Sequence, residues 1–289
     1  MDWQQKYASK IFTPDAAVQA VVQSGSRIFM TGNCSVPQEL LAALVRHAPN
    51  VSDVEICQAL AICAADYVSP EMEGHLRVNT LFISANVRKA VHEGRADFTP
   101  VLLSELPLLF QRRIIPLDAA LIHVSPPDAH GFCTYGIESG LTKSAAEAAK
   151  VVIAEVNPYM PRMLGDTFIH LDDIDYLVPV DYPLAELRMG SEGDPEVVEK
   201  IAGHIAERIP DGATMQLGIG SIPDAVLNYL MSKKDLGLHT ELFSDGVIRL
   251  VNAGVLTGAR KSLHPGKIIA GFVIGSNELY QWADDNPLI

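Results

Sequence analysis

The residues of this chain best suited to acyl-transfer chemistry lie in one segment, residues 214–246, TMQLGIGSIPDAVLNYLMSKKDLGLHTELFSDG. Its pattern predicts a strand, a glycine turn, a helix and a second strand that ends just after Glu241. A carboxylate held in a dry, oriented site can attack a thioester carbonyl. The N–H groups of a glycine turn at a helix start can stabilise the oxyanion that forms. Ligands of open α/β sheets lie at the carboxyl ends of strands, so both parts would meet on adjacent strand ends.

The setting of Glu241 favours a functional role over the solvated strand position that a glutamate usually occupies. In the strand pattern, Leu238, Thr240 and Leu242 share one face, and Glu241 lies on the other. Residues 244–246, Ser-Asp-Gly, then end the strand and begin a helix. Glu241 is therefore expected to project toward a ligand crevice.

Other residue groups are weaker candidates. Gly32–Asn33, Ser104–Glu105 and residues 155–157 could form the wall of a substrate site, although a turn or strand-end role explains each of them equally well. A basic cluster consists of Arg260, Lys261, His264 and Lys267. It could meet phosphates, but such clusters are more often solvated. None of the nine histidines forms HExxH or a comparable pair, so no metal site is expected.

The element that carries the glycine turn has a counterpart earlier in the chain. Residues 25–44, GSRIFMTGNCSVPQELLAAL, resemble residues 212–230, GATMQLGIGSIPDAVLNYL. Each runs through an apolar strand to Ser-[Val/Ile]-Pro, with the proline expected at the first position of an amphipathic helix. A capped helix precedes each unit, starting at Thr13 and at Asp194. Chance similarity between βα units is the alternative, but the agreement of four elements in order favours duplication.

The apolar runs predict an α/β fold of two related open α/β domains with mostly parallel sheets. Buried strands are expected within residues 54–61, 79–86, 118–127 and 148–156, most of them followed by loops or helical patterns. Glycines and charges in residues 187–195 place the boundary there, which gives an N-terminal domain 1–186 and a second domain 187–289. The second domain is much the shorter, so it is expected to be incomplete if the two are equivalent.

Composition bounds the class of protein and its partners. A chain of 289 residues with 48% hydrophobic and 20% charged residues is typical of a soluble globular enzyme. A net charge of −13 argues against nucleic acid as a partner. The four cysteines show no paired spacing, which suits reduced thiols. The N-terminus has no secretory pattern and the apolar run 268–275 is too short to span a bilayer, so we expect a cytoplasmic protein without a membrane partner.

The motifs together resemble a known family. QLGIGSIPDAV, residues 216–226, followed by LHTELFSDG, residues 238–246, is similar to the acetyl-CoA hydrolase/transferase group of class I CoA-transferases, in particular 4-hydroxybutyrate and acetate CoA-transferases. Residues 84–107, 123–136 and 143–162 resemble the N-terminal domain of the same family. The resemblance covers essentially the whole chain, and its motifs are specific in combination.

This resemblance implies a ping-pong transfer of coenzyme A between small carboxylic acids such as 4-hydroxybutyrate, acetate or butyrate. Glu241 would be the catalytic nucleophile and would carry a glutamyl-CoA thioester. The turn that contacts coenzyme A would be Gly218, Ile219, Gly220, Ser221 and Ile222. Coenzyme A would be a substrate, with no permanently bound cofactor, and the family suggests a homodimer.

Two alternatives remain at this point. Water could replace the acceptor acid, which would make the protein an acyl-CoA hydrolase. The chain could instead be a truncated fragment, inactive or dependent on a partner that completes the C-terminal domain. Family members are longer and carry a Gly-Gly-Gln loop beyond the region matched here, and no such motif occurs in this sequence. A sugar-phosphate isomerase of related architecture is a distant further reading.

Overall fold

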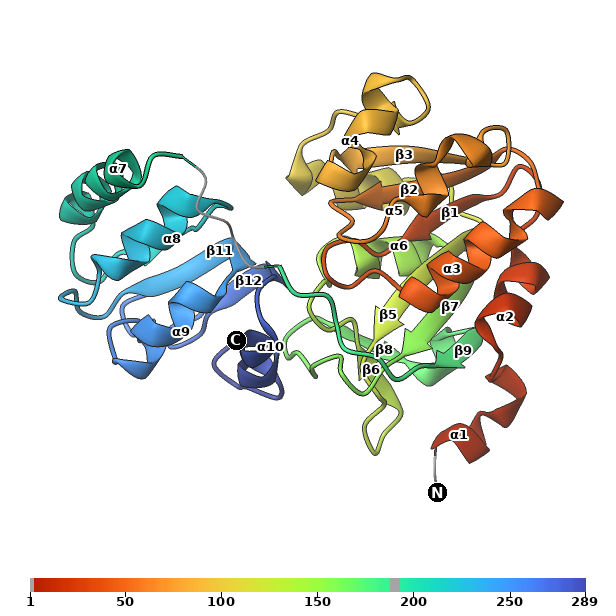
Figure 1. The fold of residues 1–289 in the computed structure, drawn as a ribbon. Helices are drawn as coiled ribbons and strands as arrows, with labels where there is room; N and C mark the ends of the chain where they lie inside the picture. Colours follow the sequence, from red (N-terminus) through yellow and green to blue (C-terminus); the bar gives the residue numbers. More distant parts are fainter. Residues whose placement is uncertain (1–2, 188–192) are drawn as a thin grey trace. The chain divides into compact units, whose positions relative to one another are not determined.

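The computed structural model describes residues 3–187 and 193–289 and divides into two compact units (Figure 1). Unit 1 comprises Met1–Arg162 and Asp166–Ala185, and unit 2 comprises Met163–Gly165 and Glu186–Ile289. The sequence predicts a domain boundary within residues 187–195. Of that segment, residues 188–192 lie outside the described residues.

Unit 1 is built on a seven-stranded parallel sheet with the order β4-β3-β2-β1-β5-β7-β9. Its strands are β1 (Arg27–Met30), β2 (Val54–Ala59), β3 (Leu76–Phe82), β4 (Asp97–Phe98), β5 (Ala119–Val124), β7 (Val151–Val156) and β9 (Tyr176–Pro179). Two further strands, β6 (Phe132–Thr134) and β8 (Phe168–His170), form a separate antiparallel pair. All six residues of β5 are buried, as expected for a parallel strand covered on both faces.

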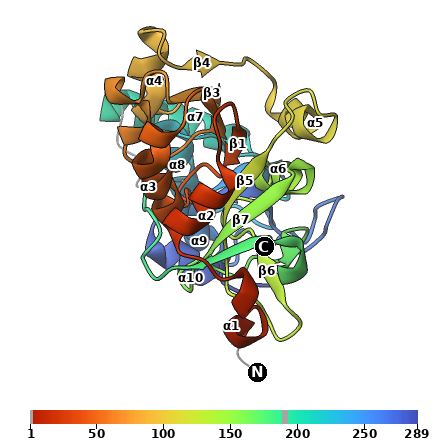
Figure 2. The ribbon, with the colours of Figure 1, turned by 90° about the vertical axis from the view of Figure 1, so that its right-hand side faces the viewer.

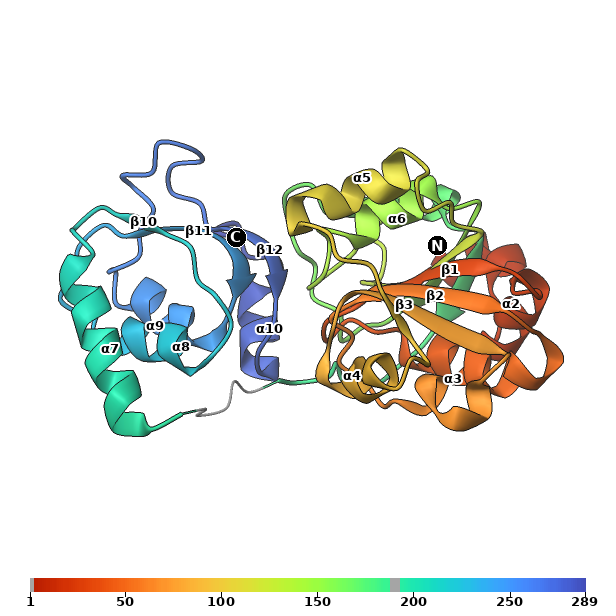
Figure 3. The ribbon, with the colours of Figure 1, turned by 90° about the horizontal axis from the view of Figure 1, so that it is seen from above.

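Helices cover both faces of this sheet (Figures 2 and 3). On one face lie α2 (Pro14–Val21), α3 (Gln38–His47) and α4 (Ala85–His92), and on the other α5 (Leu106–Gln111) and α6 (Thr142–Ala148). The chain begins with α1 (Trp3–Lys6). Short 3-10 turns complete the unit: η1 (Ala8–Lys10), η2 (Ala48–Asn50), η3 (Asp66–Val68), η4 (Pro70–Met72), η5 (Leu103–Glu105) and η6 (Leu171–Asp173). Each face of the sheet packs into its own apolar core.

Unit 2 is built on a three-stranded parallel sheet with the order β10-β11-β12. The strands are β10 (Thr214–Met215), β11 (Gly237–Phe243) and β12 (Ile269–Val273). The helices are α7 (Pro195–Arg208), α8 (Ser221–Asn228), α9 (Asp245–Asn252) and α10 (Asn277–Ala283). Helices α8 and α9 lie on one side of the sheet, and α7 packs beside α8 (Figure 3). The prediction of an α/β fold with mostly parallel sheets is confirmed.

Both units contain the same succession of elements. In unit 1 it is α2, β1, α3 and β2, and in unit 2 it is α7, β10, α8 and β11; the next strand, β3 or β12, follows after the 3-10 turns η3 and η4 in unit 1 and after helix α9 in unit 2. Phe29 pairs with Cys57 between β1 and β2, as Met215 pairs with Leu238 between β10 and β11. One difference is that β1 also pairs with β5, whereas β10 pairs only with β11 among the described residues.

The predicted helix starts are partly right. The hydroxyl of Thr13 caps α2 and the carboxylate of Asp194 caps α7, as the sequence indicates. The prolines of the repeated Ser-[Val/Ile]-Pro do not occupy the first helical position. Pro37 directly precedes α3, and Pro223 is the third residue of α8. Both placements are compatible with the proline ring, because the first turn of a helix needs no intrahelical N–H donor.

Candidate active site

Glu241 lies near the carboxyl end of β11 and is partly buried. Among the described residues, its carboxylate has no hydrogen-bond or ion-pair partner. Leu238, Thr240 and Leu242 are buried, so the predicted alternation puts Glu241 on the face of the sheet opposite the leucines. Phe243 departs from the pattern because it is buried under the ring of Trp282, with ring centroids 5.6 Å apart.

A glycine keeps space beside Glu241. Ala270 and Phe272 on β12 pair with Thr240 and Leu242, so Gly271 lies beside Glu241. A Cβ atom at position 271 would stand 3.1 Å from the backbone oxygen of Glu241, closer than side chains normally approach. Neighbouring residues in a parallel sheet project to the same face, so the missing side chain leaves room next to the carboxylate. Nothing in the sequence pattern singles out this residue.

The glycine turn runs directly into α8. Gly218 and Ile219 are exposed, and Gly220 adopts φ +134° and ψ 177°, a conformation reserved for glycine. Gly220 is the N-cap residue of α8 and supplies no side-chain cap. The N–H groups of Ser221 and Ile222 thus open the first turn, where the helix dipole favours a negative charge.

One hydroxyl joins the turn to the strand that carries Glu241. The Thr240 Oγ1 atom accepts a hydrogen bond from the Leu217 N–H at 2.9 Å. The same oxygen lies 3.1 Å from the carbonyl oxygens of Leu217 and Leu242. Leu217 precedes Gly218 and Thr240 precedes Glu241, so the contact connects the two halves of the predicted site. Thr240 was not among the site residues predicted from the sequence, because the two residues are 23 positions apart and no local pattern signals the bond.

In unit 1, the corresponding helix start is occupied by a side chain of the protein itself. Oε1 of Glu155, on β7, accepts from the Leu40 N–H of α3 at 2.6 Å. The other carboxylate oxygen accepts from the Tyr182 hydroxyl, which in turn accepts from the Gln38 N–H at 3.0 Å. Burial raises the pKa of Glu155 to about 7, although the hydrogen bonds from Tyr182 and Leu40 oppose that shift. Glu155 thus acts as a helix cap from a distant strand.

The other predicted wall residues also have local roles. The Asn157 amide donates to the Tyr182 carbonyl oxygen at 2.8 Å and lies 3.1 Å from Nε2 of His123, deep in unit 1. The Asn33 amide donates to the carboxylate of Glu138, and Asn33 itself has a left-handed backbone with φ +52°. Residues 104–105 are exposed in η5.

Lys261 of the basic cluster binds the backbone near the amino end of β11, away from the end that carries Glu241. Lys261 is buried, and its Nζ donates to the carbonyl oxygens of Leu238 at 2.8 Å and Lys267 at 2.6 Å. Burial lowers the pKa of Lys261. Arg260 donates to the Asp211 carbonyl oxygen at 3.2 Å. These two cations thus bind backbone carbonyl groups of unit 2.

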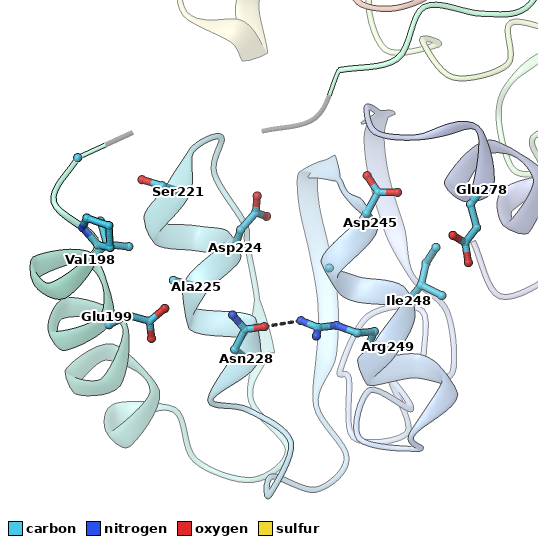
Figure 4. A pocket seen from close by; sticks show the side chains of 13 residues that line it. Val198, Glu199, Ser221, Asp224, Ala225, Asn228, Asp245, Ile248, Arg249 and Glu278 are labelled. Carbon is cyan, nitrogen blue, oxygen red and sulfur yellow. Dashed lines mark hydrogen bonds between the residues drawn. The ribbon is translucent and has the colours of Figure 1, made fainter. Parts of the chain in front are cut away.

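A groove of about 660 Å³ runs between α7, α8 and α9, and Figure 4 shows its lining. Its acidic residues are Glu199, Asp224, Asp245 and Glu278. Arg249 is the one cation among the described lining residues, and it donates to the side chain of Asn228. Burial raises the pKa of Asp224, and the nearby charge of Asp245 adds to that shift. The excess of carboxylates makes the groove a poor place for the phosphates of coenzyme A, and Glu241 does not line it.

Within residues 3–187 and 193–289, no three or more histidine, cysteine or acidic residues are grouped so that they could hold a metal ion. No helix in the same residues is both long enough and apolar enough to cross a bilayer. All four cysteines are free, and burial raises the pKa of Cys133 to about 12.

Comparison with known proteins places the chain in a family. Residues 1–184 match the model of the acetyl-CoA hydrolase/transferase N-terminal domain. The chain is 46% identical over 290 aligned positions to a 4-hydroxybutyrate coenzyme A transferase from Clostridium kluyveri, covering 100% of this chain and 67% of the relative. This chain belongs to the acetyl-CoA hydrolase/transferase family. Glu241 and the glycine turn lie outside the segment that the family model matches.

Two further relatives agree with this placement. A succinyl-CoA:acetate/propanoyl-CoA:succinate CoA transferase from Fasciola hepatica is 41% identical, over 93% of this chain and 56% of the relative. The crystal structure of a 4-hydroxybutyrate CoA-transferase from Porphyromonas gingivalis superposes with a TM-score of 0.88 at 35% identity, over 100% of this chain and 68% of that one. The chain thus spans between 56% and 68% of the length of these three proteins.

Proposed function

We propose that this chain takes part in the transfer of coenzyme A between small carboxylic acids, with Glu241 as the nucleophile. The observation that carries the proposal is a carboxylate, without a hydrogen-bond or ion-pair partner among residues 3–187 and 193–289, at the carboxyl end of a parallel strand beside a glycine turn that opens a helix. A carboxylate without hydrogen-bond partners keeps its lone pairs for a substrate carbonyl. The relatives named as CoA transferases support the same reaction class.

The proposed chemistry proceeds through two anhydrides. The Glu241 carboxylate attacks the carbonyl of the donor acyl-CoA, which gives a mixed anhydride and the coenzyme A thiolate. The thiolate attacks the glutamyl carbonyl, which gives a glutamyl-CoA thioester and releases the donor acid. The acceptor carboxylate then attacks that thioester and expels the thiolate, and the thiolate attacks the acceptor carbonyl to restore Glu241. No net proton is consumed, so the site needs oxyanion stabilisation and orientation rather than an acid–base pair.

The glycine turn is proposed to supply that stabilisation. The N–H groups of Ser221 and Ile222 at the start of α8 would face the oxyanion or the carboxylate of the substrate. The related helix start in unit 1 supports this role, since the N–H of Leu40 on α3 binds the carboxylate of Glu155. The repeated unit thus has the geometry to hold a carboxylate in at least one of its two copies.

Trapping of the glutamyl thioester tests the proposal. After incubation with acetyl-CoA, the wild-type chain should gain the mass of a coenzyme A adduct at Glu241, and borohydride should reduce that thioester. Glu241→Gln should abolish the adduct. Glu278→Gln, an exposed position in the same unit, is the matched control and should form it normally. An adduct of equal yield in Glu241→Gln, or none in the wild type, contradicts the assignment.

Hydrolysis of acyl-CoA is the second candidate, because Glu241 is only partly buried and water can approach it. Both activities use the same glutamate and differ in whether water is excluded from the intermediate. The release of free coenzyme A from acetyl-CoA, measured with and without an added acid such as butyrate, separates them. A transferase forms butyryl-CoA and releases little free coenzyme A, whereas a hydrolase releases it at the same rate in both conditions.

We propose in addition that further polypeptide packs against β10 and completes the fold of unit 2. Val197, Ile201 and Ile205 form an exposed apolar stripe on α7, 51%, 37% and 39% exposed. In unit 1, the equivalent strand β1 is covered on that side by β5, and α2 buries its own apolar residues. A strand like β5, supplied by sequence such as the additional length of the relatives, fits this surface. Sedimentation of the chain with and without that part of the Clostridium relative tests this.

Two results would point elsewhere. A homodimer that forms without the added part, and that Ile201→Glu disrupts, would make a second copy the occupant of this surface. A chain that stays monomeric and forms no complex would contradict the proposed packing.

The four free cysteines suit a reducing compartment, and we propose the cytoplasm as the location of the protein.

A further inference from the structure

We propose that Thr240 is a positioning residue that fixes the glycine turn relative to the Glu241 nucleophile. The inference deepens the proposed function and rests on it. Thr240 itself points away from the face that carries Glu241, so it does not touch the reacting atoms. It acts through the backbone of Leu217, the residue directly before the turn.

The backbone pairing of β10 ends before the turn begins. Both residues of β10, Thr214 and Met215, pair with Gly237 and Leu238, and among the described residues this pairing does not continue into Gln216 and Leu217. Strand β11 continues to Phe243 with pairing only to β12 among the described residues. The segment that leads into Gly218 therefore lacks a backbone ladder to the strand that carries the nucleophile.

The Thr240 hydroxyl connects the two segments where backbone pairing is missing. A hydroxyl can accept and donate at the same time, so it can bind both the N–H and the carbonyl group of one residue. It accepts from the Leu217 N–H at 2.9 Å and lies within 3.1 Å of the Leu217 carbonyl oxygen. Both residues are 7% exposed, so water is poorly placed to substitute for the bond.

In unit 1, a backbone hydrogen bond, and not a side-chain hydroxyl, connects the segments that follow the two strands. There the chain after β1 stays in contact with the chain after β2, because the Asn33 N–H donates to the Leu60 carbonyl oxygen at 2.8 Å. The backbone bridge between Asn33 and Ala61 continues the parallel pairing. The side-chain tether is present in the unit that carries Glu241, where the described residues show no such backbone contact at the same place.

Removal of the hydroxyl should misplace the turn. We expect Thr240→Val, which keeps the branched shape, to slow formation of the coenzyme A adduct at Glu241 by roughly 10-fold to 100-fold. Thr240→Ser restores the hydroxyl and should recover a rate close to that of the wild type. Thr80→Val is the matched control, because Thr80 is also a buried strand threonine whose hydroxyl donates two residues ahead, to the Phe82 carbonyl oxygen at 2.7 Å.

The experiment uses the full chain, acetyl-CoA as the donor and intact mass to follow the adduct with time. Wild-type, Thr240→Ser and Thr80→Val chains should form it at similar rates, and Thr240→Val slowly. A Thr240→Val chain that matches the wild type overturns the inference. If the wild type forms no adduct, the proposed function is wrong, and hydrogen exchange then decides the role of Thr240.

Amide hydrogen exchange tests the tether without any reaction. The Leu217 amide should be protected in the wild type although it lies outside the β10–β11 ladder. It should exchange faster in Thr240→Val and regain protection in Thr240→Ser. An unprotected Leu217 amide in the wild-type chain overturns the inference, and this measurement does not depend on whether Thr240→Val folds.

Discussion

Glu241 and Glu155 are two carboxylates near related helix starts, and their surroundings are opposite. Glu155 is fully buried, and each of its two carboxylate oxygens accepts a hydrogen bond, one from Leu40 and one from Tyr182. Glu241 is partly buried, and no described residue bonds to its carboxylate. The first arrangement stabilises structure, and the second leaves a nucleophile available for a substrate. The difference lies in the contacts of each side chain and not in the residue type.

The raised pKa of Glu155 predicts a pH-dependent cost in stability. Its pKa is about 7 in the folded chain against an ordinary value of 4.5, so the folded state binds the proton more tightly than the unfolded state. Proton binding by Glu155 therefore stabilises the folded chain at low pH, and the unfolding free energy falls as pH rises from about 4.5 to about 7. Glu155→Gln removes this titrating group. The unfolding free energy of the variant, relative to that of the wild type, should therefore rise by about 3 kcal/mol between pH 4.5 and pH 8.

Urea unfolding of the wild type and of Glu155→Gln at both pH values measures this difference. Other titrating groups are common to the two chains and cancel in the comparison. A difference that stays constant with pH, or that favours the wild type more at pH 8, would contradict the buried state of the carboxyl group.

At the scale of elements, the start of α8 depends on a backbone conformation that only glycine tolerates. Gly220→Ala forces a side chain into φ +134° and ψ 177°, which should lower the unfolding free energy by about 1–3 kcal/mol. The turn should also shift, and adduct formation at Glu241 should slow. Gly254→Ala is the matched control, since Gly254 has φ +70° just beyond α9 with open space around it.

Thermal unfolding and adduct kinetics together separate the two effects. Both variants should lose stability, because both place alanine at positive φ. Gly220→Ala alone should slow the adduct. Equal adduct rates in the two variants would mean that the geometry of the turn does not matter for the chemistry.

The elements also show what a sequence can reveal. Strands such as β5 and β7 were predictable because burial on both faces makes a continuous apolar run. The place of Glu241 was predictable from strand alternation and from motif resemblance. The Glu155 cap on Leu40 spans 115 positions and the Thr240 tether spans 23, so neither leaves a local periodic signal. The starts of α3 and α8 shifted by one or two residues, because several backbone arrangements satisfy a proline near a helix start.

At the scale of the whole molecule, a net charge of −13 opposes the approach of an anionic acyl-CoA. Binding must then come from short-range donors, such as backbone N–H groups, rather than from long-range attraction. The rate of adduct formation should consequently rise with ionic strength, because salt screens repulsion beyond about 10 Å. Adduct kinetics in dilute buffer and in about 0.15 M salt measure this, and a falling rate would indicate a basic docking site instead.

The net reaction also predicts where oxygen atoms go. In the proposed sequence, the donor acid leaves with one oxygen from Glu241, and the acceptor carboxylate leaves one of its own oxygens on Glu241. Turnover with an ¹⁸O-labelled acceptor acid should therefore label the Glu241 carboxyl group, which peptide mass spectrometry detects. A labelled acceptor that leaves Glu241 unlabelled would exclude the anhydride route, and label entering from water would identify hydrolysis.

The occupied helix start in unit 1 has a consequence for chemical rescue. Glu155→Ala would leave the Leu40 N–H and the Tyr182 hydroxyl facing a gap the size of a carboxyl group. Added formate or acetate should fill that gap and raise the thermal midpoint of this variant more than that of the wild type. The formate or acetate concentration that gives half of this stabilisation measures how tightly the helix start of α3 binds a free carboxylate. That affinity is a reference for carboxylate binding at the related start of α8.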